Sequence, residues 1–192
     1  MARIIGEVGA YRIEYSPPDY STIARCIVYQ QLSGKAAARI YRRLEEAAPG
    51  GAVTPEAVLR MEPARLRELG LSRQKIAYLR DFAEGMLAGE IDLAALERAP
   101  DEEVMRALTA RKGIGEWTAH MYLIFALRRP DVLPVGDLGI RVAVQRAYGF
   151  EQLPAPREVE RVGRPWRPYA SVASWYLWRS LGDGAGLDPV VD

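Results

Sequence analysis

Two glycines and one carboxylate are the residues in this sequence whose spacing best suits catalysis. Gly113 and Gly115 flank a single isoleucine directly before a predicted helix, so backbone N–H groups at the helix N-terminus can come close to a ligand. Such a turn suits an anion, and a nucleic-acid phosphate is the ligand we expect. Asp137 stands on a Pro/Gly turn that opens another predicted helix. A backbone grip on phosphate beside one placed carboxylate indicates chemistry on DNA.

The elements that must position these residues are predicted to be helices almost throughout. Apolar residues three and four apart, together with capping and stop residues, define them. The predicted helices cover residues 19–31, 33–48, 55–60, 63–69, 72–87, 92–98, 101–110, 115–128, 137–148, 156–162 and 168–181. Ser33, Thr54, Ser72 and Asp137 are side chains of the type that caps a helix N-terminus.

The segment before these helices has a different pattern. Residues 3–15 are interrupted by glycine and partly alternate, which predicts an extended segment. The fold class we expect is all-α, a single unit of two lobes with a central cleft. One lobe is expected at about residues 30–110, the second from residues 1–30 with 111–182, and a loose tail at 183–192.

Composition excludes several classes of protein. The 192 residues, 49% hydrophobic and 27% charged, suit a globular unit with a sizeable core. The single cysteine, Cys26, excludes an intrachain disulfide, a zinc finger and an iron–sulfur cluster held by four cysteines. No apolar run is long enough to cross a bilayer and the N-terminus lacks a signal-peptide core, so we expect a cytoplasmic protein without a membrane partner.

Positive charge is concentrated in the part of the chain that holds the two glycines. The net charge is only +1, but residues 111–180 hold eleven Arg or Lys and six Asp or Glu, whereas residues 1–110 hold fifteen and sixteen. A local basic surplus suits a nucleic-acid partner. It is also compatible with a merely solvated arginine-rich face.

Three separated blocks of sequence resemble the helix-hairpin-helix DNA glycosylase superfamily, in particular its alkylated-base branch, 3-methyladenine DNA glycosylase II. The blocks are residues 27–37 (IVYQQLSGKAA), residues 112–119 (KGIGEWTA) with 134–139 (PVGDLG), and residues 165–170 (PWRPYA) running into Trp175. Only about twenty residues precede the first block, so we expect a compact form of the family. The chain has no four-cysteine cluster loop, which disfavours the endonuclease III and adenine-mismatch branches.

The resemblance implies that Asp137 is the catalytic residue. A glycosylase flips its target base into a pocket and breaks the N-glycosidic bond through an oxocarbenium-like transition state. A carboxylate beside C1′ stabilises that positive charge and positions a water molecule. An N-alkylated purine already carries positive charge and leaves without protonation, so one carboxylate suffices. The alternative is that Asp137 simply caps the helix beginning at Leu138, and the two roles are compatible.

Trp117 stands where family members that also cut the DNA backbone carry a lysine nucleophile. The resemblance therefore implies a monofunctional enzyme that leaves an abasic site. Trp117 and Trp175 are the aromatic faces expected to stack on the flipped base. The further candidates for the base pocket are Tyr29, Met121 and Tyr122. For all five side chains, ordinary core packing is the alternative.

The hairpin and the loop before the second predicted helix are the expected DNA contacts. By resemblance, Gln31 inserts into the gap left by the flipped base, and a plain turn between helices is the alternative. Carbonyl oxygens of the hairpin are implied to hold Na⁺ or K⁺. The candidate DNA-binding residues are Gln30, Gln31, Leu32, Ser33, Lys35, Lys112, Gly113, Gly115 and Thr118, and the cation ligands are the carbonyls of Thr109, Arg111 and Gly113. The lone histidine, His120, is interpreted as a packed residue rather than a catalytic one.

The function expected from residues and resemblance together is excision of 3-methyladenine or 7-methylguanine in base excision repair. No organic cofactor is implied. The expected partners are damaged double-stranded DNA and the enzymes that process abasic sites, with the protein acting as a monomer. Three alternatives stay open: a glycosylase for ethenoadenine, hypoxanthine, uracil or a mismatched base, a non-catalytic damage-binding protein on the same hairpin, and a helical scaffold without a DNA role.

Overall fold

The computed structural model describes residues 1–182, and within that range it is helical and contains no β-strand. The all-α fold class is therefore confirmed. The tail predicted at residues 183–192 lies outside the described residues. The helices are α1 (Ala2–Val8), α2 (Tyr20–Tyr29), α3 (Gly34–Ala47), α4 (Pro55–Arg60), α5 (Pro63–Glu68), α6 (Arg73–Leu87), α7 (Leu93–Leu96), α8 (Asp101–Thr109), α9 (Glu116–Met121), α10 (Leu138–Tyr148), α11 (Pro156–Gly163) and α12 (Ala170–Arg179). Three short turns join them: η1 (Pro49–Gly51), the π-helical η2 (Tyr122–Ala126) and η3 (Arg164–Trp166).

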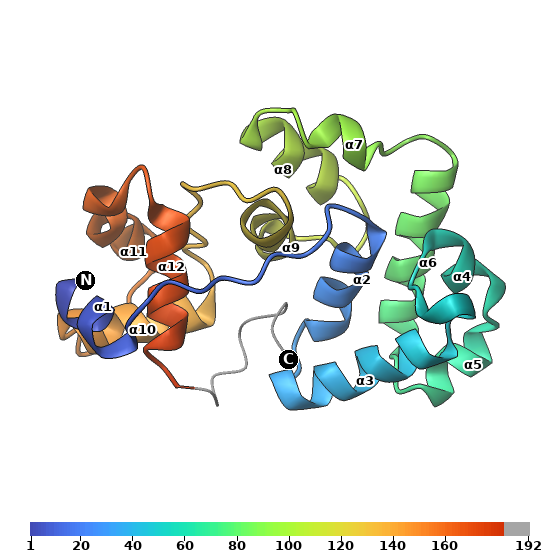
Figure 1. The fold of residues 1–192 in the computed structure, drawn as a ribbon, viewed down its shortest axis with the longest axis horizontal. Helices are drawn as coiled ribbons and strands as arrows, with labels where there is room; N and C mark the ends of the chain where they lie inside the picture. Colours follow the sequence, from blue (N-terminus) through green and yellow to red (C-terminus); the bar gives the residue numbers. More distant parts are fainter. Residues whose placement is uncertain (183–192) are drawn as a thin grey trace.

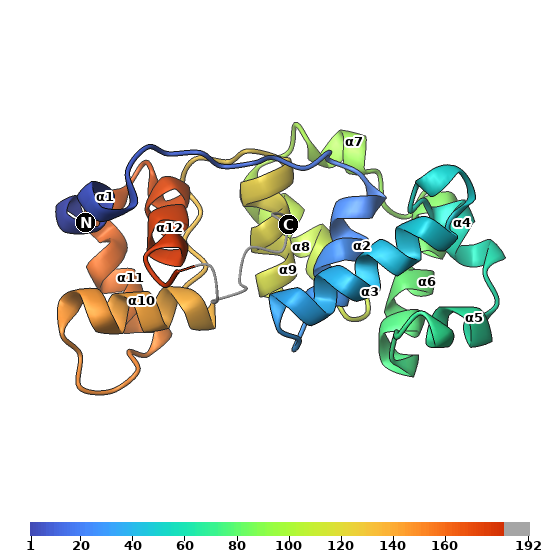
Figure 2. The ribbon, with the colours of Figure 1, turned by 60° about the horizontal axis from the view of Figure 1, so that its bottom comes forward.

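The molecule is elongated, with a group of helices at each end and α7, α8 and α9 between the two groups (Figure 1). Helices α1, α10, α11 and α12 form one end, and α3 to α6 form the other (Figure 2). Helix α2 lies between them and packs against α3, α6 and α9. Helix α2 thus links the α3–α6 end to α9 in the middle of the molecule, and the division expected near residue 30 stays a prediction.

The centre of the core is made by α2 and by the helix that follows the hairpin. Eight of the ten residues of α2 are buried, and so are all five residues of η2. Burial of each Ile or Leu side chain stabilises the fold by about 1.5–3 kcal/mol relative to leaving it exposed. The helix predicted over residues 115–128 is α9 followed by η2, where the N–H of Leu127 donates to the carbonyl of Tyr122 at 3.0 Å. That wide turn continues α9 into the core.

Helix α1 contradicts the extended segment predicted for residues 3–15. Ala2–Val8 are helical, with Ile4 buried at 3% exposure, because α1 packs against α12 and gains more from that contact than Gly6 costs. Gly9, at φ +85°, ends the helix. Residues 10–17 then run without regular structure along the molecule to α2 (Figure 2). The extended description therefore suits only the second half of the predicted segment.

Candidate active site

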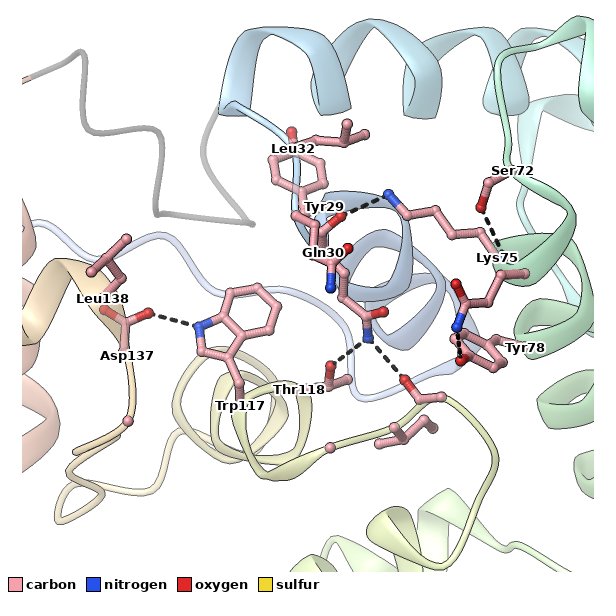
Figure 3. Close-up of a pocket in the computed structure, with 16 residues that line it drawn as sticks. Tyr29, Gln30, Leu32, Ser72, Lys75, Tyr78, Trp117, Thr118, Asp137 and Leu138 are labelled. Atoms are coloured by element: carbon pink, nitrogen blue, oxygen red, sulfur yellow. Dashed lines mark hydrogen bonds between the residues drawn. The ribbon is translucent and has the colours of Figure 1, made fainter. Parts of the chain in front are cut away.

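A pocket of about 840 Å³ lies where four segments meet between the two ends of the molecule. The segments are the loop after α2, the first turns of α6, the hairpin before α9 and the turn before α10 (Figure 3). The lining residues are Tyr29, Gln30, Gln31, Leu32, Ser72, Gln74, Lys75, Tyr78, Gly113, Ile114, Gly115, Trp117, Thr118, Gly136, Asp137 and Leu138. The first and second blocks, far apart in sequence, thus supply one cavity, whereas no residue of the third block lines it.

Asp137 presents a carboxylate whose orientation is fixed by three N–H donors. Oδ1 accepts the backbone N–H of Ile140 at 2.8 Å and the indole N–H of Trp178 at 2.9 Å. Oδ2 accepts the indole N–H of Trp117 at 2.7 Å (Figure 3). The Ile140 contact is an N-cap, so the capping role considered for Asp137 is confirmed. The residue is only 3% exposed, yet it lines the pocket.

Trp117 brings an aromatic face to the same point. It is the second residue of α9, partly buried, and its ring lies in the pocket with the indole nitrogen directed at Asp137 (Figure 3). Tyr29, from the end of α2, also lines the pocket. One carboxylate and two aromatic rings from three different elements therefore share one cavity.

The structure corrects the predicted placement of three other side chains. Met121 and Tyr122 are fully buried in the hydrophobic core and do not line the pocket, because α9 runs from the pocket into the core. Trp175 does not line it either. The ring of Trp175 packs edge-to-face against Tyr11 at 4.9 Å between centroids, beneath the segment that follows α1. Trp178, three residues along α12, is the tryptophan that reaches Asp137.

The two glycines of the hairpin differ in backbone conformation and in the space around them. Gly113 has φ +79°, and a Cβ atom there would lie 2.0 Å from the ring of Tyr78. The fold itself therefore requires glycine at 113. Gly115 has φ −96° and is the N-cap of α9, and nothing lies within 4 Å of the position of its Cβ. The space beside Gly115 is open to a ligand that approaches the start of α9.

Gln30 is a link between the loop after α2 and the hairpin rather than a free polar side chain. Its Nε2 donates to the carbonyl of Gly113 at 2.9 Å and to Oγ1 of Thr118 at 3.1 Å. Thr118 is buried, so both side chains are engaged inside the protein. The side-chain nitrogen of Gln30 is thus engaged within the protein, whereas the DNA contact expected of Thr118 is its backbone N–H, which these bonds do not involve and which stays a prediction.

The exposed tip of that loop is Gln31 and Leu32. Gln31 has φ +58°, a left-handed conformation uncommon outside glycine, and Leu32 is 40% exposed. Below the tip, Nζ of Lys75 donates to the carbonyls of Val28 and Gln30, the latter at 2.9 Å. Burial lowers the pKa of Lys75. The loop is therefore held at its base while its tip projects from the fold.

Lys75, Tyr78 and Trp178 are site residues that the sequence analysis missed. Nothing in the sequence of α6 relates it to the hairpin, so no local signal points to Lys75 or Tyr78. The sequence does offer an indication of Trp178. It lies three residues after the candidate Trp175, and residues three apart lie near one another on a helix surface.

The basic residues of the hairpin also differ in their surroundings. Arg111 forms ion pairs with Asp81 at 3.2 Å and Glu90 at 2.7 Å, and its guanidinium lies against Gly85, where a Cβ would come within 2.5 Å of it. Arg111 therefore anchors the hairpin to α6. Lys112 is exposed beside it.

Three further predicted residues lie away from the pocket lining. Ser33 and Lys35 are exposed at the start of α3, where Ser33 is the N-cap without a side-chain hydrogen bond. His120 is partly buried, and burial lowers its pKa, opposed by the charge of Glu116. This placement agrees with the interpretation of His120 as a packed residue.

The fold and this pocket identify the class of protein. Residues 24–168 match the HhH-GPD superfamily of base excision DNA repair proteins, and the chain belongs to that family. It is 35% identical over 184 residues to DNA-3-methyladenine glycosylase 1 of Schizosaccharomyces pombe, covering 93% of this chain and 80% of that protein. The predicted resemblance to the alkylated-base branch of the superfamily is thereby confirmed.

Two solved structures match the fold closely. The first is 3-methyladenine DNA glycosylase of Schizosaccharomyces pombe in complex with abasic DNA, with a TM-score of 0.88 and 35% identity over 93% of this chain and 89% of that one. The second is a DNA-3-methyladenine glycosidase from Bacillus halodurans, with a TM-score of 0.80 and 36% identity, covering 98% of this chain and 88% of that one.

In residues 1–182, no helix is long and apolar enough to cross a membrane.

Proposed function

We propose that this protein is a monofunctional DNA glycosylase that hydrolyses the N-glycosidic bond of alkylated bases, of the 3-methyladenine and 7-methylguanine type, in base excision repair. The observation that carries the proposal is the pairing of one oriented carboxylate, Asp137, with the ring of Trp117 in a single pocket. The names of the related proteins support the choice of alkylated bases.

The chemistry follows from the positions of these two residues. A nucleotide flipped into the pocket places its base beside the ring of Trp117 and its sugar near Oδ2 of Asp137. As the C1′–N bond breaks, the electron pair leaves with the base, and a cationic N-alkylated purine departs neutral. Asp137 stabilises the sugar cation, and a water molecule then adds at C1′ and releases one proton to the solvent. Asp137 is the only carboxylate among the described lining residues, so no second one is placed to protonate the base.

The same geometry supports a monofunctional enzyme. Residue 117 carries an indole, which forms no Schiff base with the sugar. The product is an abasic site in an intact strand, which other repair enzymes then process. A monomer suffices for this reaction, and we place it in the cytoplasm, where it meets chromosomal DNA.

DNA is held by the hairpin and by the loop after α2. Backbone N–H groups at the start of α9 grip a phosphate beside Gly115, where the space is open, and Lys112 adds positive charge. Gln31 and Leu32 project from the fold and enter the gap left by the flipped base. Phosphate contacts of this kind make binding weaken steeply with salt.

The cation proposed at the hairpin is compatible with the oxygens available there. The carbonyl of Arg111 accepts the N–H of Ile114 at 3.2 Å, and that of Gly113 accepts Nε2 of Gln30. Each carbonyl has a second lone pair, and neutral oxygens suit Na⁺ or K⁺. Together with the carbonyl of Thr109, these would hold the ion and stiffen the hairpin.

The test is release of free base from methylated duplex DNA. We expect the wild type to release 3-methyladenine, with strand breaks appearing only after alkali, and Asp137→Asn to be slower by about 100-fold or more. Asp137→Asn should bind DNA as tightly as the wild type or more tightly, since a negative charge near phosphates is removed. Asp92→Asn is the matched control, because Asp92 caps α7 through Ala95 at 3.0 Å but lies outside the pocket.

Two results would contradict the proposal. Full base release by Asp137→Asn would exclude Asp137 as the catalytic residue. If the wild type releases no alkylated base, duplexes with ethenoadenine, hypoxanthine, uracil and mismatches are tested next. Tight binding without release from any of them would favour a damage-binding protein.

A further inference from the structure

Trp178 is a buried tryptophan whose only polar atom is directed at Asp137. It lies on α12, is 5% exposed, and its Nε1 donates to Oδ1 of Asp137 at 2.9 Å across 41 positions of sequence. The residue does not line the pocket. It therefore approaches the carboxylate from behind, on the side away from the nucleotide site.

The two oxygens of Asp137 are held in different ways. Oδ1 receives two donors, the backbone N–H of Ile140 and the indole of Trp178, and both belong to residues outside the pocket lining. Oδ2 receives one donor, from Trp117, which does line the pocket. Occupation of the pocket by a nucleotide can thus change the surroundings of Oδ2, while those of Oδ1 stay as they are.

We propose that Trp178 is a positioning residue for the reaction: it fixes Oδ1 so that Oδ2 of Asp137 faces the sugar of the flipped nucleotide. This inference rests on the proposed function. Without Trp178, Oδ1 would keep only the N-cap bond to Ile140, and Oδ2 would keep only the bond from Trp117, a side chain in the pocket that a bound nucleotide can displace. The indole of Trp178 gives Oδ1 a second donor that a nucleotide in the pocket does not displace, and misplacement of the carboxylate by about 1 Å can cost a factor of 10² in rate.

Core packing alone does not account for an indole at this position. The ring of Trp178 stacks on Phe125 at 5.8 Å between centroids, a contact that a phenylalanine ring could also make. Trp175, one turn earlier on α12, is equally buried, and its Nε1 has no hydrogen-bond partner. The fold therefore accepts a buried indole without a partner, and the contact that distinguishes Trp178 is the one to Asp137.

The matched pair Trp178→Phe and Trp175→Phe tests the role in catalysis. The measurements are the single-turnover rate of base release from methylated duplex DNA, with enzyme in excess, and the Kd for a duplex holding a stable abasic-site analogue. We expect Trp178→Phe to slow release at least tenfold with Kd changed less than twofold. Trp175→Phe should change the rate less than threefold. Equal losses in the two variants, or a parallel loss of rate and affinity in Trp178→Phe, would show a structural role only and overturn the inference.

A second measurement does not depend on activity. The chain has four tryptophans, at 117, 166, 175 and 178, so the ¹H–¹⁵N spectrum has four indole signals, assigned from Trp→Phe variants. Asp137→Asn should move the signals of Trp117 and Trp178 and leave that of Trp175 in place. An unmoved Trp178 signal would exclude the contact. If the wild type proves inactive on every lesion, the proposed function fails, while the spectrum still decides whether Trp178 holds Asp137.

Discussion

The side-chain amide of Gln30 donates to the carbonyl of Gly113, 83 positions later in the chain, at an N–O distance of 2.9 Å. This bond joins the loop after α2 to the hairpin, the two segments that we propose to contact DNA on either side of the flipped nucleotide. The same nitrogen donates a second hydrogen bond, to Oγ1 of Thr118. The loop and the hairpin are thus one structural unit, and their spacing is set before DNA binds.

Removal of this link should weaken both the fold and the reaction. Gln30→Ala deletes two hydrogen bonds, which costs about 1–2 kcal/mol, and should lower Tm by about 3–6 °C. Base release should slow as well, because loop and hairpin lose their fixed spacing. Gln31→Ala is the control in thermal unfolding, since Gln31 is exposed and its Tm should match that of the wild type. Equal Tm values for both variants would mean that the Gln30 link carries no stability.

Replacement of each hairpin glycine by alanine should affect a different property, stability at position 113 and DNA affinity at position 115. Gly113→Ala places a side chain at φ +79° and against the ring of Tyr78, so it should lower the free energy of unfolding by about 1 kcal/mol or more. Gly115→Ala has an ordinary φ and open space, so Tm should be unchanged while affinity for duplex DNA falls. The check is thermal unfolding beside a DNA titration. Unchanged DNA affinity for Gly115→Ala would argue against phosphate at this point.

Arg111 and Lys112 are adjacent, yet we predict that only Lys112 contributes to DNA binding. Lys112→Ala should weaken binding uniformly across sequences and reduce the slope of log Kd against log salt by about 1. Arg111→Met should leave that slope unchanged and cost about 1–2 kcal/mol of stability, because it breaks ion pairs with Asp81 and Glu90. A salt slope reduced by Arg111→Met would show that Arg111 leaves these partners to bind DNA.

His120 should make the fold sensitive to mild acid. Burial lowers its pKa in the folded state below the ordinary value of 6.5, so as the pH falls through about 6.5 the unfolded chain binds a proton that the folded chain does not. The free energy of unfolding therefore decreases as the pH falls below about 6.5. Well above that pH, His120 is neutral in both states and does not make the stability depend on pH. Between pH 7.5 and 5.5 the wild type should lose more stability in urea than His120→Gln. Parallel losses would show that His120 is readily protonated in the fold.

Helices and their caps could be predicted from the sequence because they depend on neighbours within a few positions. Thr54 and Ser72 cap α4 and α6 as expected, each at 3.1 Å to a backbone N–H. The extended segment predicted at residues 3–15 was wrong over residues 3–8, because the helix found there depends on burial of Ile4 and on packing against α12, which lies far along the chain. A local pattern carries no information on such a distant contact.

The sequence by itself determined the family, the position of the hairpin and the choice of Asp137 and Trp117 as site candidates, because each lies in a short block of residues. Only the tertiary structure decided which second indole meets Asp137, which polar side chains are already paired, and which glycine the fold requires. Trp178 rather than Trp175 reaches the carboxylate because α12 packs against α10, whose N-cap is Asp137, with Trp178 on the side that meets this residue. The side-chain nitrogen of Gln30 is hydrogen-bonded to the hairpin because α2 ends beside it. These contacts join positions 41 and 83 residues apart, and the packing of whole helices sets them.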